Sequence, residues 1–140
     1  MTPITIKATV NAPVAKVWDY YSLPEHVVQW NAAHESWHCP KAENDFKVGG
    51  RFSYRMEARD GSFGFDFAGV YNSVNPQESF AYTMDDQRKV VIDFVAKNED
   101  TTEITVVFDP ESINDPEFQK QGWQAILDNF KIIRKGINSK

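Results

Sequence analysis

Strict alternation of apolar and polar residues predicts most of the strands in this chain. In residues 4–10, ITIKATV, every second residue is apolar, which is the period-two pattern of a strand with one buried face. The alternation returns over residues 50–58 and 63–72, separated by Asp60-Gly61, a pair that predicts a two-residue hairpin turn with positive φ. Three more strands are predicted in SFAYTM, KVVIDFVAK and TTEITVVFD, separated by turn-forming residues.

A different spacing predicts three helices. Apolar residues at three- and four-residue intervals follow Pro13, a residue favoured at the first helical position, and PEHVVQW at 24–30 predicts a second short helix. A long helix is predicted from about 116 to 137, with an apolar stripe of Phe118, Trp123, Ile126, Leu127, Phe130, Ile133 and Ile137 that fits the helical period with small slips. Residues 31–45 are the least regular part of the chain.

The predicted order is one strand, two short helices, five or six antiparallel strands and one long helix. This is an α+β arrangement, in which a single long amphipathic helix is available to cover one face of an antiparallel sheet. A twisted sheet curls around such a helix, and the mismatch between curl and cylinder leaves space. Aromatic residues make up 14% of the chain, so any such space is a candidate apolar pocket.

Composition narrows the class of protein. The 140 residues favour one domain, and the net charge of −5 without a basic block argues against nucleic acid as a partner. No apolar run is long enough to predict a membrane span. Cys39 is the single cysteine, so no internal disulfide is expected, and the first residues lack a signal-peptide pattern. We expect a cytoplasmic protein, as a monomer or homodimer.

Four stretches in sequence order resemble the helix-grip superfamily, also called START/Bet v1-like or SRPBCC. They are ATVNAPVAKVWDYYSLPEHVVQW, FKVGGRFSYRMEARDGS, GVYNSVNPQESFAYT and GWQAILDNFKIIRKGI. Within that superfamily the pattern is most similar to the bacterial AHSA1-like branch, the relatives of the activator of Hsp90 ATPase. The resemblance implies one domain over residues 1–140, with a curved antiparallel sheet wrapped around the C-terminal helix and two short helices after the first strand.

Members of this fold bind apolar small molecules, act as cyclases or hydrolases, or serve as protein partners. The leading hypothesis is therefore non-catalytic binding of a small hydrophobic or amphipathic molecule between the sheet and the last helix, without a cofactor. Two alternatives stay open. One is a stress- or chaperone-related module with a protein partner, and the other is an enzyme of the cyclase or hydrolase type.

The predicted ligand contacts are aromatic and apolar side chains. The helix stripe around Trp123 either packs in the core or lines a cavity, and one helix can do both. Period two does not say which face of the 63–67 segment points inward, and the resemblance places Phe65 and Phe67 toward the cavity. Buried hydroxyls of Tyr54 and Tyr82 need a partner, which is backbone, water or a polar group of the ligand. The predicted set is Trp30, Trp37, Tyr54, Met56, Phe65, Phe67, Tyr82, Phe94, Trp123 and Leu127.

Two groups of polar residues are considered as a metal site and as an acid-base site. His34, His38 and Cys39 have a spacing seen in metal sites, but the further ligands that zinc needs are missing, so no metal site is predicted. Arg55, Glu57 and Asp66 fall on paired strands, where carboxylates could transfer protons if buried. Their sequence neighbours favour a solvated charge cluster across the strands, so no catalytic residue is assigned.

Overall fold

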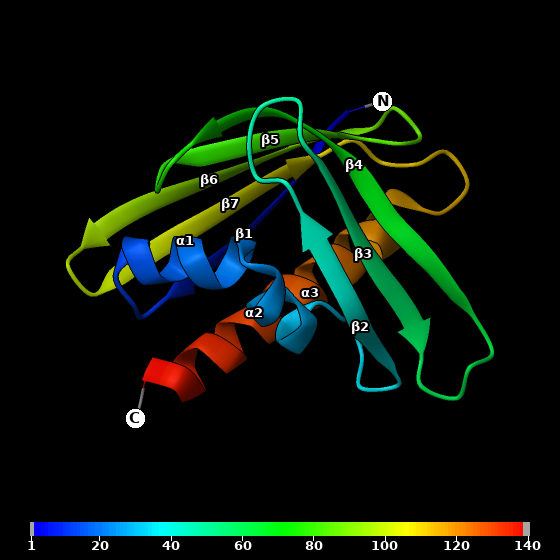
Figure 1. The fold of residues 1–140 in the computed structure, drawn as a ribbon, viewed down its shortest axis with the longest axis horizontal. Helices are drawn as coiled ribbons and strands as arrows, with labels where there is room; N and C mark the ends of the chain where they lie inside the picture. The colour runs from blue at the N-terminus through cyan, green and yellow to red at the C-terminus, as the bar shows by residue number, and fades with distance from the viewer. Residues whose placement is uncertain (1, 139–140) are drawn as a thin grey trace.

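The computed structural model describes the backbone of residues 2–138 and the side chains of residues 2–131. Within that range the chain forms seven strands and three helices (Figure 1). In chain order these are β1 (Ile4–Val10), α1 (Val14–Ser22), α2 (Pro24–Trp30), β2 (Trp37–Asn44), β3 (Arg51–Ala58), β4 (Gly64–Asn75), β5 (Ser79–Met84), β6 (Lys89–Asn98), β7 (Thr101–Phe108) and α3 (Pro116–Asn138).

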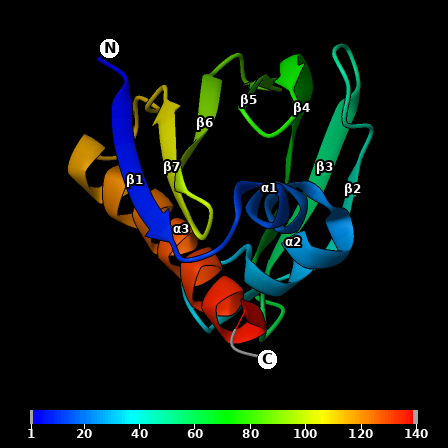
Figure 2. The ribbon, with the colours of Figure 1, turned by 90° about the vertical axis from the view of Figure 1, so that its left-hand side faces the viewer.

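One antiparallel sheet contains all of these strands, in the order β1-β7-β6-β5-β4-β3-β2. Every neighbouring pair except β1 and β7 is consecutive in sequence, so the sheet is a meander whose first strand joins the last. The sheet curls, and α3 runs along its open side next to β1, while α1 and α2 occupy the remaining part of that side (Figure 2). The predicted fold class, a curved antiparallel sheet around a long C-terminal helix, is confirmed.

The alternation that predicted the strands also sets which face is buried. In β7, Thr102, Ile104, Val106 and Phe108 are all buried, and the residues between them are partly exposed. Burying one face of each strand in this way removes apolar area from water and fixes the register, since a one-residue slip would expose the whole buried set.

The segment 31–45 is more regular than its sequence predicts. Residues 37–44 form β2 at one edge of the sheet, paired with β3, with a bulge between His38 and Lys41 around Pro40. Proline lacks the N–H that a ladder needs, and a bulge moves side chains from one face to the other. Both effects remove the alternation from the sequence.

The prediction of a two-residue turn at Asp60-Gly61 was wrong. The β3–β4 loop spans residues 59–63 instead of two residues, and Gly61 adopts positive φ while Asp60 does not. The strand predicted to begin at residue 50 begins at Arg51, and Gly49 and Gly50 precede it in a turn. Gly49 has a φ of +84°, and a Cβ on Gly50 would collide with the carbonyl oxygen of Asp45.

Aromatic rings dominate the core between α1 and the sheet. Trp18 of α1 lies 5.4 Å from Phe46, 5.8 Å from Phe80 and 5.1 Å from Phe94, measured between ring centroids. These contacts hold α1 against the sheet and close one end of its open side. No helix in the described part of the chain is long and apolar enough to cross a membrane.

Candidate ligand-binding cavity

A cavity of about 440 Å³ lies between the curled sheet and α3. Its volume falls in the range of small-molecule sites, roughly 300–1,000 Å³. Residues from all three helices and from every strand except β2 contribute to its wall. The lining residues are Ile6, Tyr21, Trp30, Asn31, Phe52, Tyr54, Met56, Phe65, Phe67, Tyr71, Phe80, Tyr82, Arg88, Ile92, Val106, Glu111, Gln119, Trp123, Ile126 and Leu127.

The apolar stripe of α3 both lines the cavity and packs in the core. Trp123, Ile126 and Leu127 line the cavity. One turn later, Phe130 is 1% exposed and packs 5.1 Å from the rings of both Tyr21 and Trp30. Core packing and cavity lining, the two alternatives that the sequence left open for this stripe, therefore apply to different parts of one helix face. Phe118, also expected in the stripe, is 66% exposed in the first turn of α3, and Ile133 and Ile137 lie outside the described side chains.

Trp123 connects this helix wall to the sheet. Its indole stacks on the ring of Phe108 in β7, with centroids 4.0 Å apart and planes 6° from parallel. It meets Phe67 of β4 edge-to-face at 6.1 Å. The ring is half-buried, because its remaining surface borders the cavity.

Strand register resolves which face of the β3–β4 hairpin points inward. Tyr54 lies opposite Phe67, and Met56 lies opposite Phe65, so all four side chains share the face that lines the cavity. Phe65 and Phe67 therefore both line the cavity, and their contact with a ligand stays a prediction. Phe65 is 44% exposed, so it stands where the cavity opens to solvent.

Four tyrosines line the cavity, and two of them are paired with each other. Tyr54 and Tyr71 share a hydrogen bond, and Asn44 Nδ2 donates to the Tyr71 hydroxyl at 3.3 Å and to the Ser22 carbonyl oxygen at 2.8 Å. This chain of hydrogen bonds ties the end of α1 to three strands. Burial is the main cause that raises the pKa of Tyr54 and Tyr71, so both hydroxyls stay neutral.

The other two tyrosines, Tyr21 and Tyr82, form no hydrogen bond with the residues that the structure describes. Tyr82 is 6% exposed. Burial raises the pKa of both hydroxyls above that of an exposed tyrosine. The cavity wall thus holds two neutral hydroxyls whose hydrogen-bonding capacity is not used by any residue that the structure describes.

Charged and polar groups gather at a separate part of the wall. Arg88, from the β5–β6 turn, donates through Nε to Asp86 at 2.8 Å. Gln119 of α3 is buried and holds the loop before its helix: its Oε1 accepts from the Glu111 N–H at 2.8 Å, and its Nε2 donates to the Glu111 and Asn114 carbonyl oxygens. Arg88, Glu111 and Gln119 all reach the cavity wall.

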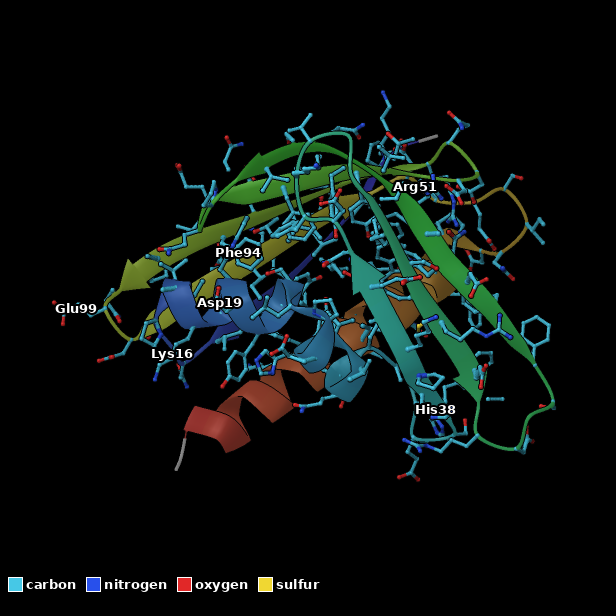
Figure 3. All side chains as sticks on the ribbon, in the orientation of Figure 1. Lys16, Asp19, His38, Arg51, Phe94 and Glu99 are labelled. Atoms are coloured by element: carbon cyan, nitrogen blue, oxygen red, sulfur yellow. The ribbon has the colours of Figure 1, made fainter. Side chains whose placement is uncertain are left out.

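Eight of the ten predicted contact residues line this cavity; Trp37 and Phe94 do not. Phe94 on β6 is 4% exposed and packs beneath α1, 5.1 Å from Trp18 and 5.6 Å from Tyr21 (Figure 3). Trp37 begins the edge strand β2, where it contacts the rings of Phe63 and Phe65 at 6.0 and 6.1 Å. An edge position puts it beyond the wall formed by β3 and β4.

Several wall residues were missed, although some had a readable signal. Phe52 shares the alternation of Tyr54 and Met56, and Phe80 shares that of Tyr82. The pattern that identified those residues could therefore have identified Phe52 and Phe80 as well. Tyr21 belongs to the apolar face of α1. Arg88, Glu111 and Asn31 lie in connections between elements, where no periodicity indicates a direction.

The polar groupings outside this cavity form ion pairs and hydrogen bonds at the surface. Arg55 Nε donates to Glu57 at 2.8 Å and Arg55 Nη1 lies 3.4 Å from Asp66, and all three side chains are at least 38% exposed. This confirms the predicted solvated cluster. His34 Nδ1 lies 2.9 Å from the Ser36 hydroxyl, while His38 on β2 faces Glu57 at 3.8 Å (Figure 3). The described residues contain no group of three side chains placed to hold a metal ion.

A second hollow, of about 500 Å³, lies between the α2–β2 loop and α3. Trp37, His34 and His38 line it, which places these sequence-predicted residues together but apart from the main cavity. Cys39 also borders it and is 3% exposed, and burial raises the pKa of its thiol to about 11.

A family profile and the solved structures that resemble this chain agree on the family to which it is similar. The profile of the family described as activator of Hsp90 ATPase homolog 1-like protein matches residues 11–134. The solution structure of an AHSA1-like protein from Aeromonas hydrophila is 36% identical, with a TM-score of 0.91 over 99% of this chain and 95% of that one. A solution structure from Cytophaga hutchinsonii is 44% identical, with a TM-score of 0.83 over 98% of this chain and 94% of that one.

More distant structures share only the fold. A crystal structure from Nitrosomonas europaea superimposes with a TM-score of 0.82 at 16% identity, over 99% of this chain and 97% of that one. The comparison with curated proteins finds no match.

Proposed function

The chain belongs to the family of activator of Hsp90 ATPase homolog 1-like proteins, and on that premise we propose that it binds a small hydrophobic or amphipathic molecule between its sheet and α3. The observation that carries this proposal is the cavity itself. A void of about 440 Å³ walled mainly by aromatic and aliphatic side chains is costly to keep filled with water, and an apolar ligand gains by replacing that water.

The proposed role is binding without catalysis, in the cytoplasm. The cavity wall offers shape, apolar surface and tyrosine hydroxyls, which suits retention of a ligand. Its charged members, Arg88 and Glu111, come from loops at one part of the wall, and Arg88 is engaged by Asp86.

A cavity-filling variant tests the proposal. Ile126 lines the cavity from the middle of α3, and replacing it with tryptophan adds bulk inside the void. Lys120 is exposed on the same helix, so Lys120→Trp adds the same ring outside it. We expect the neutral fluorescent probe N-phenyl-1-naphthylamine to bind the wild type and Lys120→Trp with one-to-one stoichiometry, and Ile126→Trp to lose binding.

Mass spectrometry of the protein purified under native conditions adds a second readout. A retained small molecule, released on denaturation and absent from Ile126→Trp, supports the proposal. Equal probe binding by the wild type and Ile126→Trp, with no retained molecule, contradicts it.

The second candidate, a protein-interaction module, is favoured by exposed rings at the end of the β3–β4 hairpin. Phe63 is 63% exposed and Phe65 is 44% exposed, and both contact Trp37. Exposed aromatic clusters are frequent at protein interfaces. If the wild-type protein binds neither the probe nor a native small molecule, this candidate takes first place.

A further inference from the structure

Two tyrosines of the cavity wall, Tyr21 and Tyr82, restrict the chemistry of a ligand in this cavity. Tyr82 is 6% exposed, and its hydroxyl has no hydrogen-bond partner among the described residues. Among those residues, the one fully sealed side-chain polar atom without a partner is His26 Nδ1. The Tyr82 oxygen is therefore not sealed in the core, and it opens onto the cavity that its side chain lines.

Tyr21 lines the same cavity, and its hydroxyl likewise has no hydrogen-bond partner among the described residues. The rings of Tyr21 and Tyr82 lie on Phe80, with centroids 6.1 and 6.3 Å from its own. The two phenols are close enough that charge on Tyr21 raises the pKa of Tyr82. Both are thus neutral O–H donors, carried by neighbouring positions on one cavity wall.

Unused donors in an apolar cavity restrict the ligand. A hydrocarbon that fills the space removes water from these hydroxyls and leaves two buried donors unpaired, which lowers its affinity. A ligand with an acceptor oxygen at the same depth restores the hydrogen bonds and avoids that loss. Donors are the more demanding half of each hydroxyl, since an unpaired N–H or O–H is rarer in proteins than an under-used oxygen.

The charges around the cavity do not favour an ionic ligand. Arg88 is the basic residue of the wall, and its guanidinium is paired with the Asp86 carboxylate at 2.8 Å. Glu111, an acidic residue, lines the same cavity. An anionic head group would have to compete with Asp86 for Arg88, and the Glu111 carboxylate on the same wall would repel it.

We infer that the cavity selects an uncharged, mainly apolar molecule carrying a carbonyl oxygen, as in a ketone, ester or amide, and that Tyr21 and Tyr82 donate hydrogen bonds to it. This inference rests on the proposed binding function and specifies its ligand. Tyr54 and Tyr71 line the same cavity but bond to each other and to Asn44, so they contribute wall surface and not free donors.

Three probes of similar shape and different chemistry test the assignment. Benzophenone carries a carbonyl between two rings, diphenylmethane is the corresponding hydrocarbon, and diphenylacetate adds a carboxylate. Binding of each is measured by isothermal titration calorimetry to the wild type, Tyr82→Phe, Tyr21→Phe and the control Thr105→Val, which removes a hydroxyl on the outer face of β7, away from the cavity. The wild type should prefer benzophenone to diphenylmethane by about tenfold, the size expected for one or two net hydrogen bonds.

The variants separate the roles of the hydroxyls. Tyr82→Phe and Tyr21→Phe keep the ring and remove no hydrogen bond within the described protein, so they should fold as the wild type does. Each should reduce the preference for benzophenone several-fold, while Thr105→Val keeps it. The infrared carbonyl band of bound benzophenone should lie at lower frequency in the wild type than in Tyr82→Phe, because a donated hydrogen bond weakens the C=O bond.

The outcomes distinguish this inference from the function on which it rests. If none of the three probes binds, the binding function itself fails. If benzophenone and diphenylmethane bind equally well, or if diphenylacetate binds the wild type most tightly, the cavity binds ligands but the assigned ligand class is wrong. An unchanged carbonyl band in Tyr82→Phe also overturns the assigned role of Tyr82.

Discussion

Replacing Trp123 with alanine separates core packing from ligand contact, because its indole takes part in both. One face of the ring lies on Phe108 at 4.0 Å, and its edge meets Phe67 at 6.1 Å. The remaining surface borders the cavity. The substitution removes packing from one side of the ring and removes wall surface from the other.

The expected loss of stability follows from this geometry. Truncating a fully buried Phe or Trp to alanine costs about 3–5 kcal/mol. Trp123 is half-buried and already borders empty space, so fewer atomic contacts are lost. Half of the full value is a loss of about 2 kcal/mol, of which the stack on Phe108 supplies about 1 kcal/mol. Trp18 is 7% exposed and absent from the cavity wall, so Trp18→Ala should cost the full 3–5 kcal/mol.

Urea denaturation and titration with N-phenyl-1-naphthylamine measure the two effects on the same samples. Trp123→Ala should lose about 2 kcal/mol and bind the probe at least tenfold more weakly. If Trp18→Ala does not fold, Trp18→Phe supplies the comparison, with probe affinity close to that of the wild type. The reasoning is refuted if Trp123→Ala loses as much stability as a core truncation while the probe affinity is unchanged.

Three further predictions concern stability. Thr102 Oγ1 donates to the Ala12 carbonyl oxygen at 2.9 Å, with both residues 0% exposed, so Thr102→Val should lose about 1–3 kcal/mol in urea denaturation while Thr105→Val on the other face of β7 stays near the wild type. Gln119→Ala removes the acceptor of the Glu111 N–H, so hydrogen exchange at that amide should accelerate by about tenfold. An unchanged exchange rate would show that the hydrogen bond to Gln119 does not protect this amide. Burial raises the pKa of Cys39 from 9.0 to about 11 and those of Tyr54, Tyr71 and Tyr82 above 10.0. These groups ionise more readily in the unfolded chain, so stability should be constant up to about pH 9 and fall as the pH rises through 11; a flat urea midpoint over that range would contradict the burial of these groups.

Most of the fold was predictable because its strands and helices each bury one face. Alternation in β1, β3, β5, β6 and β7 matches the observed burial, and the 3.6-residue period of α3 begins at Pro116 as expected. β2 was not predictable, because a bulge and Pro40 break its alternation. The β3–β4 loop was predicted too short, since Asp-Gly occurs in longer hairpin loops as well as in two-residue turns.

The cavity was harder to predict than the fold. Alternation identifies side chains that point toward the sheet's inner face, but it does not tell which of them another element covers. Phe94 and Tyr82 have the same inward direction, yet α1 covers Phe94 and leaves Tyr82 bordering the cavity. Hydrogen bonding between Tyr54 and Tyr71 depends on the register of two strands, which single-strand patterns do not contain.

The edges of the sheet have a consequence for self-association. At the edge formed by β1, α3 lies alongside the strand, and Gln124 Nε2 donates to the Lys7 carbonyl oxygen at 3.0 Å. On β2, Pro40 offers no N–H and the bulge between His38 and Lys41 interrupts the ladder. A strand from another molecule therefore finds neither edge suited to continuous backbone pairing, which is the route to fibrils and to strand-swapped dimers. A homodimer of this protein should form through side-chain surfaces, and concentrated solutions should resist conversion to cross-β aggregates as long as the chain stays folded.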